Sequence, residues 1–434
     1  MLTHTTETEN PVSAVPLVVP ETRPVDEARS PAASLPWPLR MLRDGWLIVG
    51  LSGLLIVTLE LGYRAQGSIR RWLGGQTSQE AFFDGKPPWM DRLIAEEQES
   101  ANLRWKPYVY FRRQPFHGAF LNVDSLGHRR TVQDAAPAPA RQVFFFGGST
   151  MFGTFQRDSG TIPSAVARDL RGRGVSDAWL TNFGETGYVL TQEVIELLLQ
   201  LRSGARPSAV VFYDGINDVY ALWQNGEPGL PQNEFNRERE FRLGRRVFNW
   251  RHDAATEAGA MAALAQASLS RMELVNRLLR QAGASQPRAA GDATPTPDSL
   301  AAMLVQSYAA TARLVGALAK AYGFHALLVW QPTLHGTTKP LSPSESLIVQ
   351  RILNDPAESR IRQVHQRTPV LLDSAMADVS DVAFLNLATV FATDSGQIFA
   401  DQIGHTNERA NGPIASAISS KLAEMLRQPG ATRR

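Results

Sequence analysis

A short apolar run at residues 143–146 (Val-Phe-Phe-Phe) ends abruptly in Gly147, Gly148 and Ser149, and a helical pattern resumes from Thr161. An apolar run of this length that is ended by glycines predicts a fully buried strand. Glycine lets the backbone turn sharply without a Cβ penalty. Ser149 is therefore expected where a strand passes into a helix, at the carboxyl edge of a sheet, where open α/β folds bind ligands. Any such turn tolerates Gly and Ser, so this stretch alone does not establish a site.

Strand and helix patterns then alternate along the chain. The strand patterns cover residues 143–146, 179–182, 209–213, 326–330 and 382–387, and the helical patterns cover residues 162–171, 192–202, 300–322, 345–353 and 411–427. Strands separated by such helices predict βαβ units and a parallel sheet covered on both faces. We expect a three-layer α/β/α sandwich with a five-stranded parallel sheet of flavodoxin-like order at residues 141–434. The alternation lapses at about 225–298, which predicts a helical insertion with a solvated charged face.

The amino-terminal part of the chain predicts a tail followed by a membrane helix. Residues 1–44 are rich in Pro, Thr, Glu and Ala without apolar periodicity, which predicts a disordered tail. Residues 46–59 carry no charge, and the apolar pattern continues past Glu60 to Tyr63, close to the span of about 20 residues that a membrane requires. A cleaved signal peptide and a buried core helix are the alternatives. The long polar leader argues against the first, and the apolar character on every side argues against the second. We favour a transmembrane helix at residues 45–63.

The charges beside this helix leave its orientation open. Arg40 and Arg43 precede it, and Arg64, Arg70 and Arg71 follow it, so the positive-inside rule does not choose a side. The tail is the easier part to leave in the cytoplasm. We therefore expect a single-pass protein of the bacterial inner (cytoplasmic) membrane with its large domain outside. Residues 64–140 are expected to form a lead-in segment packed on that domain.

Composition excludes several classes of function. The net charge of +2 provides no basic face for nucleic acid. Cysteine is absent, which excludes disulfides and thiolate metal sites. Asp214 and Asp218 flank Asn217, but no histidine cluster at ligand spacing accompanies them, so we expect neither a metal nor a cofactor. His335 follows the fourth strand pattern and is expected to be a surface or loop-packing residue.

Four polar stretches are expected to converge on one edge of the sheet. Three follow strand ends, and the fourth lies in the loop before the last helix. A parallel sheet gathers such loops on one edge. The stretches are residues 147–149, 182–187, 213–218 and 401–405.

The residue types in these stretches suit acyl transfer. The hydroxyl of Ser149 becomes a good nucleophile when a base takes its proton, and His405 is available as that base. A carboxylate from Asp401 on the other ring nitrogen would hold the imidazole in the required tautomer. The oxyanion of the tetrahedral intermediate requires donors arranged beforehand. We expect these donors to be the backbone N–H groups of Ser149 and Gly184 and the side-chain amide of Asn217.

Ser149, Gly184, Asn217 and His405 are, in this order, the four residue types that name the SGNH (GDSL-like) hydrolase superfamily, and the chain resembles that superfamily. Residues 147–150 (Gly-Gly-Ser-Thr) are similar to the first block of its envelope-associated members, with Gly148 where the better-known motif has Asp. Residues 182–187 match Asn-x-Gly-x-x-Gly, and residues 215–218 match Gly-x-Asn-Asp. Similar proteins also carry an amino-terminal membrane helix and a lead-in segment. The resemblance covers about residues 105–427.

The last block departs from the family pattern. The family places Asp three residues before His, whereas Asp401 lies four residues before His405, with Gly404 as the apparent insertion. Either a bulged loop absorbs the extra residue, or the site works as a Ser–His pair.

The resemblance implies a membrane-anchored serine esterase with Ser149 as nucleophile and His405 as base. The expected substrate is an O-acyl, in particular O-acetyl, ester on an envelope or exported polysaccharide, because a tethered enzyme meets polymers that pass through the envelope. Two alternatives remain open at this stage. One is an O-acetyltransferase that uses the same site, and the other is a non-catalytic module of a polysaccharide assembly complex that keeps the site as a binding pocket.

Overall fold

The structure is a computed structural model that describes residues 36–72, 83–135, 138–234, 237–238, 241 and 295–427. Most of the predicted tail and most of the predicted insertion at 225–298 lie outside the described residues. The chain divides into two compact units, Met1–Gln66 and Gly67–Arg434.

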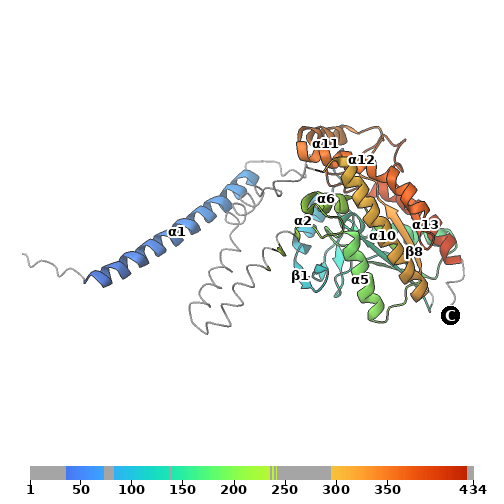
Figure 1. Cartoon of the computed structure of the whole chain (residues 1–434), viewed down its shortest axis with the longest axis horizontal. Helices are drawn as coiled ribbons and strands as arrows, with labels where there is room; N and C mark the ends of the chain where they lie inside the picture. Colours follow the sequence, from blue (N-terminus) through green and yellow to red (C-terminus); the bar gives the residue numbers. More distant parts are fainter. Residues whose placement is uncertain are drawn as a thin grey trace, which may run out of the picture. The chain divides into compact units, whose positions relative to one another are not determined.

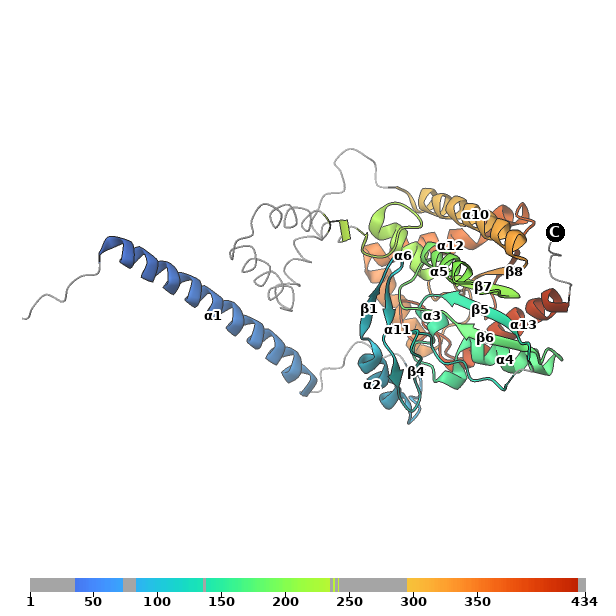
Figure 2. The same cartoon turned by 90° about the horizontal axis from the view of Figure 1, so that it is seen from below.

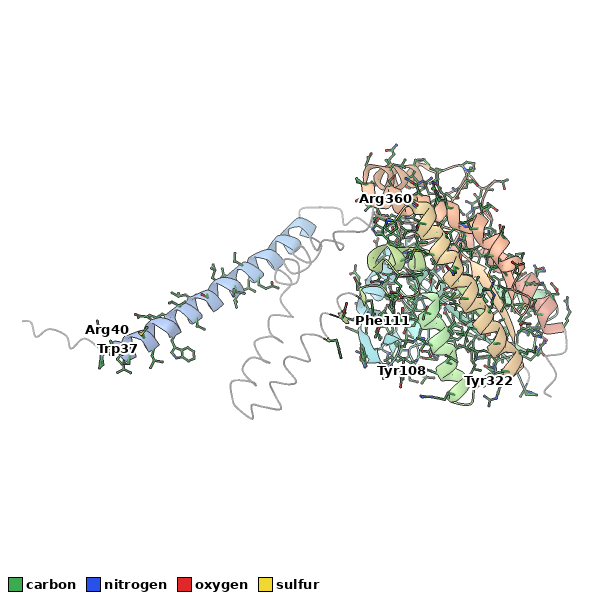
Figure 3. All side chains as sticks on the ribbon, viewed as in Figure 1. Trp37, Arg40, Tyr108, Phe111, Tyr322 and Arg360 are labelled. Carbon is green, nitrogen blue, oxygen red and sulfur yellow. The ribbon has the colours of Figure 1, made fainter. Side chains whose placement is uncertain are left out.

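The described part of the amino-terminal unit belongs to a long helix, α1 (Trp37–Trp72). Its stretch Trp37–Gly62 has a mean hydropathy of 1.8 and is long and apolar enough to cross a membrane. Side chains such as Trp37 and Arg40 project around it (Figure 3). The helix extends beyond the predicted membrane segment 45–63 at both ends, because it starts at Trp37 and continues to Trp72. Residues 37–44, expected in the tail, are therefore helical.

A five-stranded parallel sheet forms the centre of the second unit, as predicted. Its order is β6-β5-β7-β8-β9. This order is flavodoxin-like, because β6, the second strand of the sheet along the chain, lies at the edge next to β5, the first. Each of the five predicted strand positions is occupied by a strand. The strands are β5 (Arg141–Gly147), β6 (Ala178–Asn182), β7 (Ala209–Asp214), β8 (His325–Trp330) and β9 (Ala383–Asn386).

Alternate residues of these strands build two cores, one on each face. In β5, Val143 and Phe145 enter one core, and Phe144 and Phe146 enter the other. This follows from the two-residue period of a strand. Figure 2 shows α4 and α13 on one face and α5, α6, α10 and α12 on the other, with α10 and α12 in front of the sheet in Figure 1. These helices are α4 (Ile162–Gly172), α5 (Leu190–Arg202), α6 (Ile216–Asn225), α10 (Pro297–Tyr322), α12 (Pro356–Ala377) and α13 (Asn411–Arg427).

Helix α12 was not predicted, because two prolines interrupt its sequence pattern. Pro356 occupies the first helical turn, where a missing N–H removes no hydrogen bond. Pro369 lies inside the helix, and its carbonyl accepts a hydrogen bond of 3.1 Å from the side chain of Asn386 at the end of β9. The preceding helix, α11 (Pro343–Asn354), agrees with the predicted helix at 345–353.

Between residues 83 and 135, which the structure describes, the lead-in segment has one helix and two small hairpins. Met90 and Leu93 of its helix pack in one apolar cluster with Phe152 and Phe155, which directly follow the glycine-rich turn. An ion pair between Arg129 and Asp158 joins the same two regions. The elements are α2 (Met90–Ser100), β1 (Leu103–Lys106), β2 (Tyr110–Arg113), β3 (Phe116–His117) and β4 (Asn122–Val123).

Candidate active site

Ser149 lies at the first position of a one-turn helix, α3 (Ser149–Phe152), directly after β5. Figure 2 shows α3 beside the sheet strands. The turn ends at Gly153, whose φ of 94° is left-handed and whose N–H donates to the carbonyl of Ser149 at 2.9 Å. The first N–H groups of any helix have no partner within it. The Ser149 N–H therefore starts this helix without an intrahelical acceptor, as an oxyanion donor requires.

The structure brings Ser149, His405 and Asp401 into one hydrogen-bonded series. The Nε2 atom of His405 lies 2.7 Å from the Oγ atom of Ser149, and its Nδ1 atom lies 2.6 Å from Oδ2 of Asp401. The extra residue before His405 is accommodated by Gly404, whose φ of 84° lies in the left-handed region that glycine adopts readily. With this loop, the carboxylate of Asp401 lies within hydrogen-bond distance of His405 despite the extra residue.

The imidazole of His405 is buried between negative charges. Burial alone would lower its pKa, but the charge of Asp401, the hydrogen bond to it and the charge of Glu97 together raise the pKa above its ordinary value. Raising the pKa favours the imidazolium that forms when the ring accepts a proton.

Asn217 lies in the first turn of α6 with its amide held on two sides. Its Nδ2 donates to the carbonyl of Tyr188 at 2.8 Å, and its Oδ1 accepts a hydrogen bond of 3.0 Å from Gln232. A Cβ atom on Gly148 would stand 2.1 Å from Asn217 Nδ2. The glycine beside Ser149 thus leaves room for an amide nitrogen that has a second N–H to donate.

The backbone N–H of Gly184, expected to be an oxyanion donor, has a hydrogen-bond partner in this structure. It donates to the side-chain oxygen of Asn182 at 2.8 Å and is therefore already engaged. A Cβ atom at this position would lie 2.4 Å from the backbone nitrogen of Phe152. The glycine is needed here for close packing against α3.

Sequence reasoning missed several residues that surround these groups. Gln156 donates to the carbonyl of Thr406 at 3.0 Å and accepts from Asn411 at 2.9 Å, which joins the chain after α3 to the loop that carries His405. Glu97 comes from the lead-in segment and accepts a hydrogen bond from Phe155. These residues belong to no motif block, and no pattern in the sequence singled them out.

His335 is a loop-packing residue, as one of the two expectations stated, and it has no exposed surface. Its Nε2 atom lies 2.8 Å from the carbonyl of Gln402, in the same loop as Asp401 and His405. Burial lowers its pKa to about 4, so the ring is neutral at physiological pH and Nε2 carries the proton that this carbonyl accepts.

Three buried carboxyl groups lie near Asn217. Burial raises the pKa of Glu193 and of Asp214 well above the ordinary value, and it raises that of Asp218 to about 6. Within the described residues, no group of three His, Asp or Glu side chains is arranged to hold a metal ion. Asp218 instead accepts a hydrogen bond of 3.1 Å from the backbone of Leu190.

No protein-family model matches the chain, and no curated protein matches it in sequence. Solved structures similar to it include an acetyl xylan esterase, at 14% identity over 65% of this chain and 99% of that one, with a TM-score of 0.33. A carbohydrate acetylesterase family member from Sinorhizobium meliloti shares 13% identity over 66% and 100%, with a TM-score of 0.32. A lipolytic protein of the G-D-S-L family from Veillonella parvula shares 11% over 65% and 97%, with a TM-score of 0.34. Likeness at this level carries no argument about activity.

Proposed function

We propose that this chain is a membrane-anchored serine esterase of SGNH type that removes O-acyl groups, in particular O-acetyl groups, from an envelope or exported polysaccharide. The observation that carries the proposal is the series of two short hydrogen bonds from Ser149 through His405 to Asp401, 2.7 and 2.6 Å long. A base within about 3 Å of a hydroxyl is in reach of its proton.

In the proposed acylation step, the Ser149 oxygen attacks the ester carbonyl while its proton passes to Nε2 of His405. The Nδ1–H of the resulting imidazolium donates to Asp401, which stabilises the positive charge. His405 then returns the proton to the departing sugar oxygen, and the acyl group remains on Ser149. Attack by water, with His405 again as base, releases the acid and restores the serine.

The proposed oxyanion donors are the Ser149 N–H and the second N–H of Asn217. Both belong to first helical turns, at the starts of α3 and α6. Removal of one such donor typically costs about 3 kcal/mol of transition-state stabilisation. Gly184 would add a third donor only if its N–H left Asn182, since that bond occupies it in this structure.

The proposed location follows from α1, whose length and apolar character suit a single membrane span. We propose that the large domain lies outside the cytoplasm, where it would meet polymers in transit. Acylated carbohydrate is the proposed substrate, and polysaccharide assembly proteins are the proposed partners.

The test uses the full chain in detergent, with acetate release from a model acetyl ester and from acetylated polysaccharide as readouts. Ser149→Ala should abolish release from both. Ser176→Ala, at an exposed position, is the control and should keep wild-type rates. Equal turnover by wild type and Ser149→Ala would end the proposal. Acetyl transfer to an added acceptor glycan, in place of free acetate, would identify an O-acetyltransferase.

A further inference from the structure

Phe155 has an unusual backbone conformation close to His405. Its φ is 64°, in the left-handed region that bulky residues rarely adopt. Strained positions of this kind persist only where the surroundings hold them, and they cluster at functional sites. The residue lies in the turn that follows α3, where the N–H of Thr154 donates to the carbonyl of Ser149 at 3.1 Å.

A carboxylate from the lead-in segment holds this conformation. The Phe155 N–H donates to Oε1 of Glu97 at 2.6 Å, and Glu97 lies in α2. This is a charge-assisted hydrogen bond, the stronger kind. Its partners are separated by 58 residues in the chain. The lead-in segment therefore sets a backbone angle within the candidate active site.

The Phe155 side chain transmits this constraint to the proposed base. Its ring packs edge to face against the ring of His405, with centroids 5.6 Å apart and planes at 88°. On another side it meets Phe83 in the same way, at 5.6 Å and 86°. Edge-to-face pairs have a preferred geometry, so a Phe155 ring fixed by these neighbours limits the orientations open to the imidazole.

We propose that Glu97 is a positioning residue of the active site, because its carboxylate fixes Phe155 against His405 and places a second negative charge beside the imidazolium that forms there. The inference rests on the proposed function, in which His405 is the base. It assigns to the lead-in segment a part in catalysis that the four motif blocks do not include.

The charges around Glu97 agree with this role. Burial raises its pKa, and the Phe155 hydrogen bond together with the charges of Arg129, His405 and Arg113 opposes that rise. Arg113 comes from β2, and Arg129 follows β4. On the His405 side, the facing charges are Asp401 and Glu97, and both raise the pKa of the imidazole. Removing the Glu97 charge should therefore lower the pKa of His405.

Two substitutions separate the two parts of the proposed role. Glu97→Gln keeps an oxygen acceptor for the Phe155 N–H and removes the charge. Glu97→Leu removes both. Glu99→Gln, at an exposed position on the same helix, is the matched control. A fourth variant, Phe155→Leu, removes the ring while leaving Glu97 in place.

The measurement is the rate at which a fluorophosphonate labels Ser149 in the full chain in detergent, followed by intact mass from pH 5 to 9. The labelling reaction requires that His405 be neutral. It can be measured without knowing the natural substrate. Glu97→Gln should move the acid limb of the profile to lower pH by roughly half a unit or more, with a plateau close to wild type. Glu97→Leu and Phe155→Leu should lower the labelling rate at the plateau by about 10-fold or more, because an imidazole that is no longer held in place takes the serine proton less effectively. Glu99→Gln should match wild type.

The outcomes distinguish this inference from the proposed function. Absence of Ser149 labelling in the wild type would count against the serine esterase itself. Labelling of the wild type with an unshifted acid limb in Glu97→Gln would overturn the positioning role of Glu97. An unchanged plateau in Phe155→Leu would overturn the part assigned to the ring. If Glu97→Leu fails to fold, the pH profile of Glu97→Gln decides the matter alone.

Discussion

Asp401 holds His405 with both of its carboxylate oxygens. Oδ2 lies 2.6 Å from the ring Nδ1, and Oδ1 accepts the backbone N–H of His405 at 3.1 Å. The same carboxylate therefore orients the imidazole and closes the loop that carries it. His335 supports this loop from another side through the carbonyl of Gln402.

Replacing Asp401 with Asn should reduce kcat/KM by about 10³–10⁴-fold, because the amide no longer selects the required imidazole tautomer. The acid limb of the pH–rate profile should also move to lower pH, since Asp401 raises the pKa of His405. Steady-state kinetics on a model acetyl ester provides the measurement. Asp394→Asn is the control, because Asp394 pairs instead with Arg409. Activity within a few-fold of wild type would mean that a Ser–His pair suffices.

In the pH profile of kcat/KM for the wild type, the midpoint of the acid limb should lie above the ordinary histidine pKa of about 6.5. A general base works only when neutral, and the raised pKa of His405 keeps it protonated to higher pH than a free imidazole. Activity should therefore rise with pH through that raised value. The profile of kcat/KM reports the free enzyme and is the quantity to measure. A limb well below pH 6 would contradict the electrostatic account.

Gly148→Ala should lower kcat by about 10²–10³-fold, the usual effect of losing one oxyanion donor. The added Cβ would stand 2.1 Å from Nδ2 of Asn217 and would displace that amide. Binding of the substrate should change less, so KM should stay near its wild-type value. Gly172→Ala is the control, because a Cβ there meets no atom within 4 Å. An unaffected kcat in Gly148→Ala would exclude Asn217 as a donor.

Asp218→Asn should stabilise the protein more at pH 8 than at pH 5. The folded-state pKa of Asp218 is raised by burial to about 6, above the ordinary value of about 3.9 for an unfolded chain. Its stabilising protonated form is therefore lost as pH rises from about 4 through 6. An amide cannot ionise and still accepts the Leu190 hydrogen bond. The measurement is the melting temperature of the variant minus that of the wild type, followed by circular dichroism. This difference should be about 2–4 °C larger at pH 8 than at pH 5. A constant difference would contradict this account.

Much of the site follows from local sequence patterns. Ser149 and Asn217 were predicted from apolar runs that end in glycine or polar residues, because strand ends in a parallel sheet share an edge. His405 was predicted from its place in the loop before the last helix. The shift of one residue before His405 was visible in the sequence, but its consequence was not. Whether Asp401 reached the ring depended on the backbone angle of Gly404, which sequence spacing does not specify.

Other features depended on contacts between distant segments. Gly184 was expected to donate to an oxyanion, yet its N–H is engaged by the Asn182 side chain. Helix α12 was missed because Pro369, which disfavours a helix locally, is accommodated by tertiary packing.

The five strands of the central sheet, the glycine turn before Ser149 and an apolar segment suited to a membrane are properties of short stretches, and the sequence alone determined them. The placement of Glu97 and Phe155 beside His405 was decided only by the tertiary structure. The physical reason is that a half-buried carboxylate and a strained backbone angle are stable only when charges and rings from distant segments surround them.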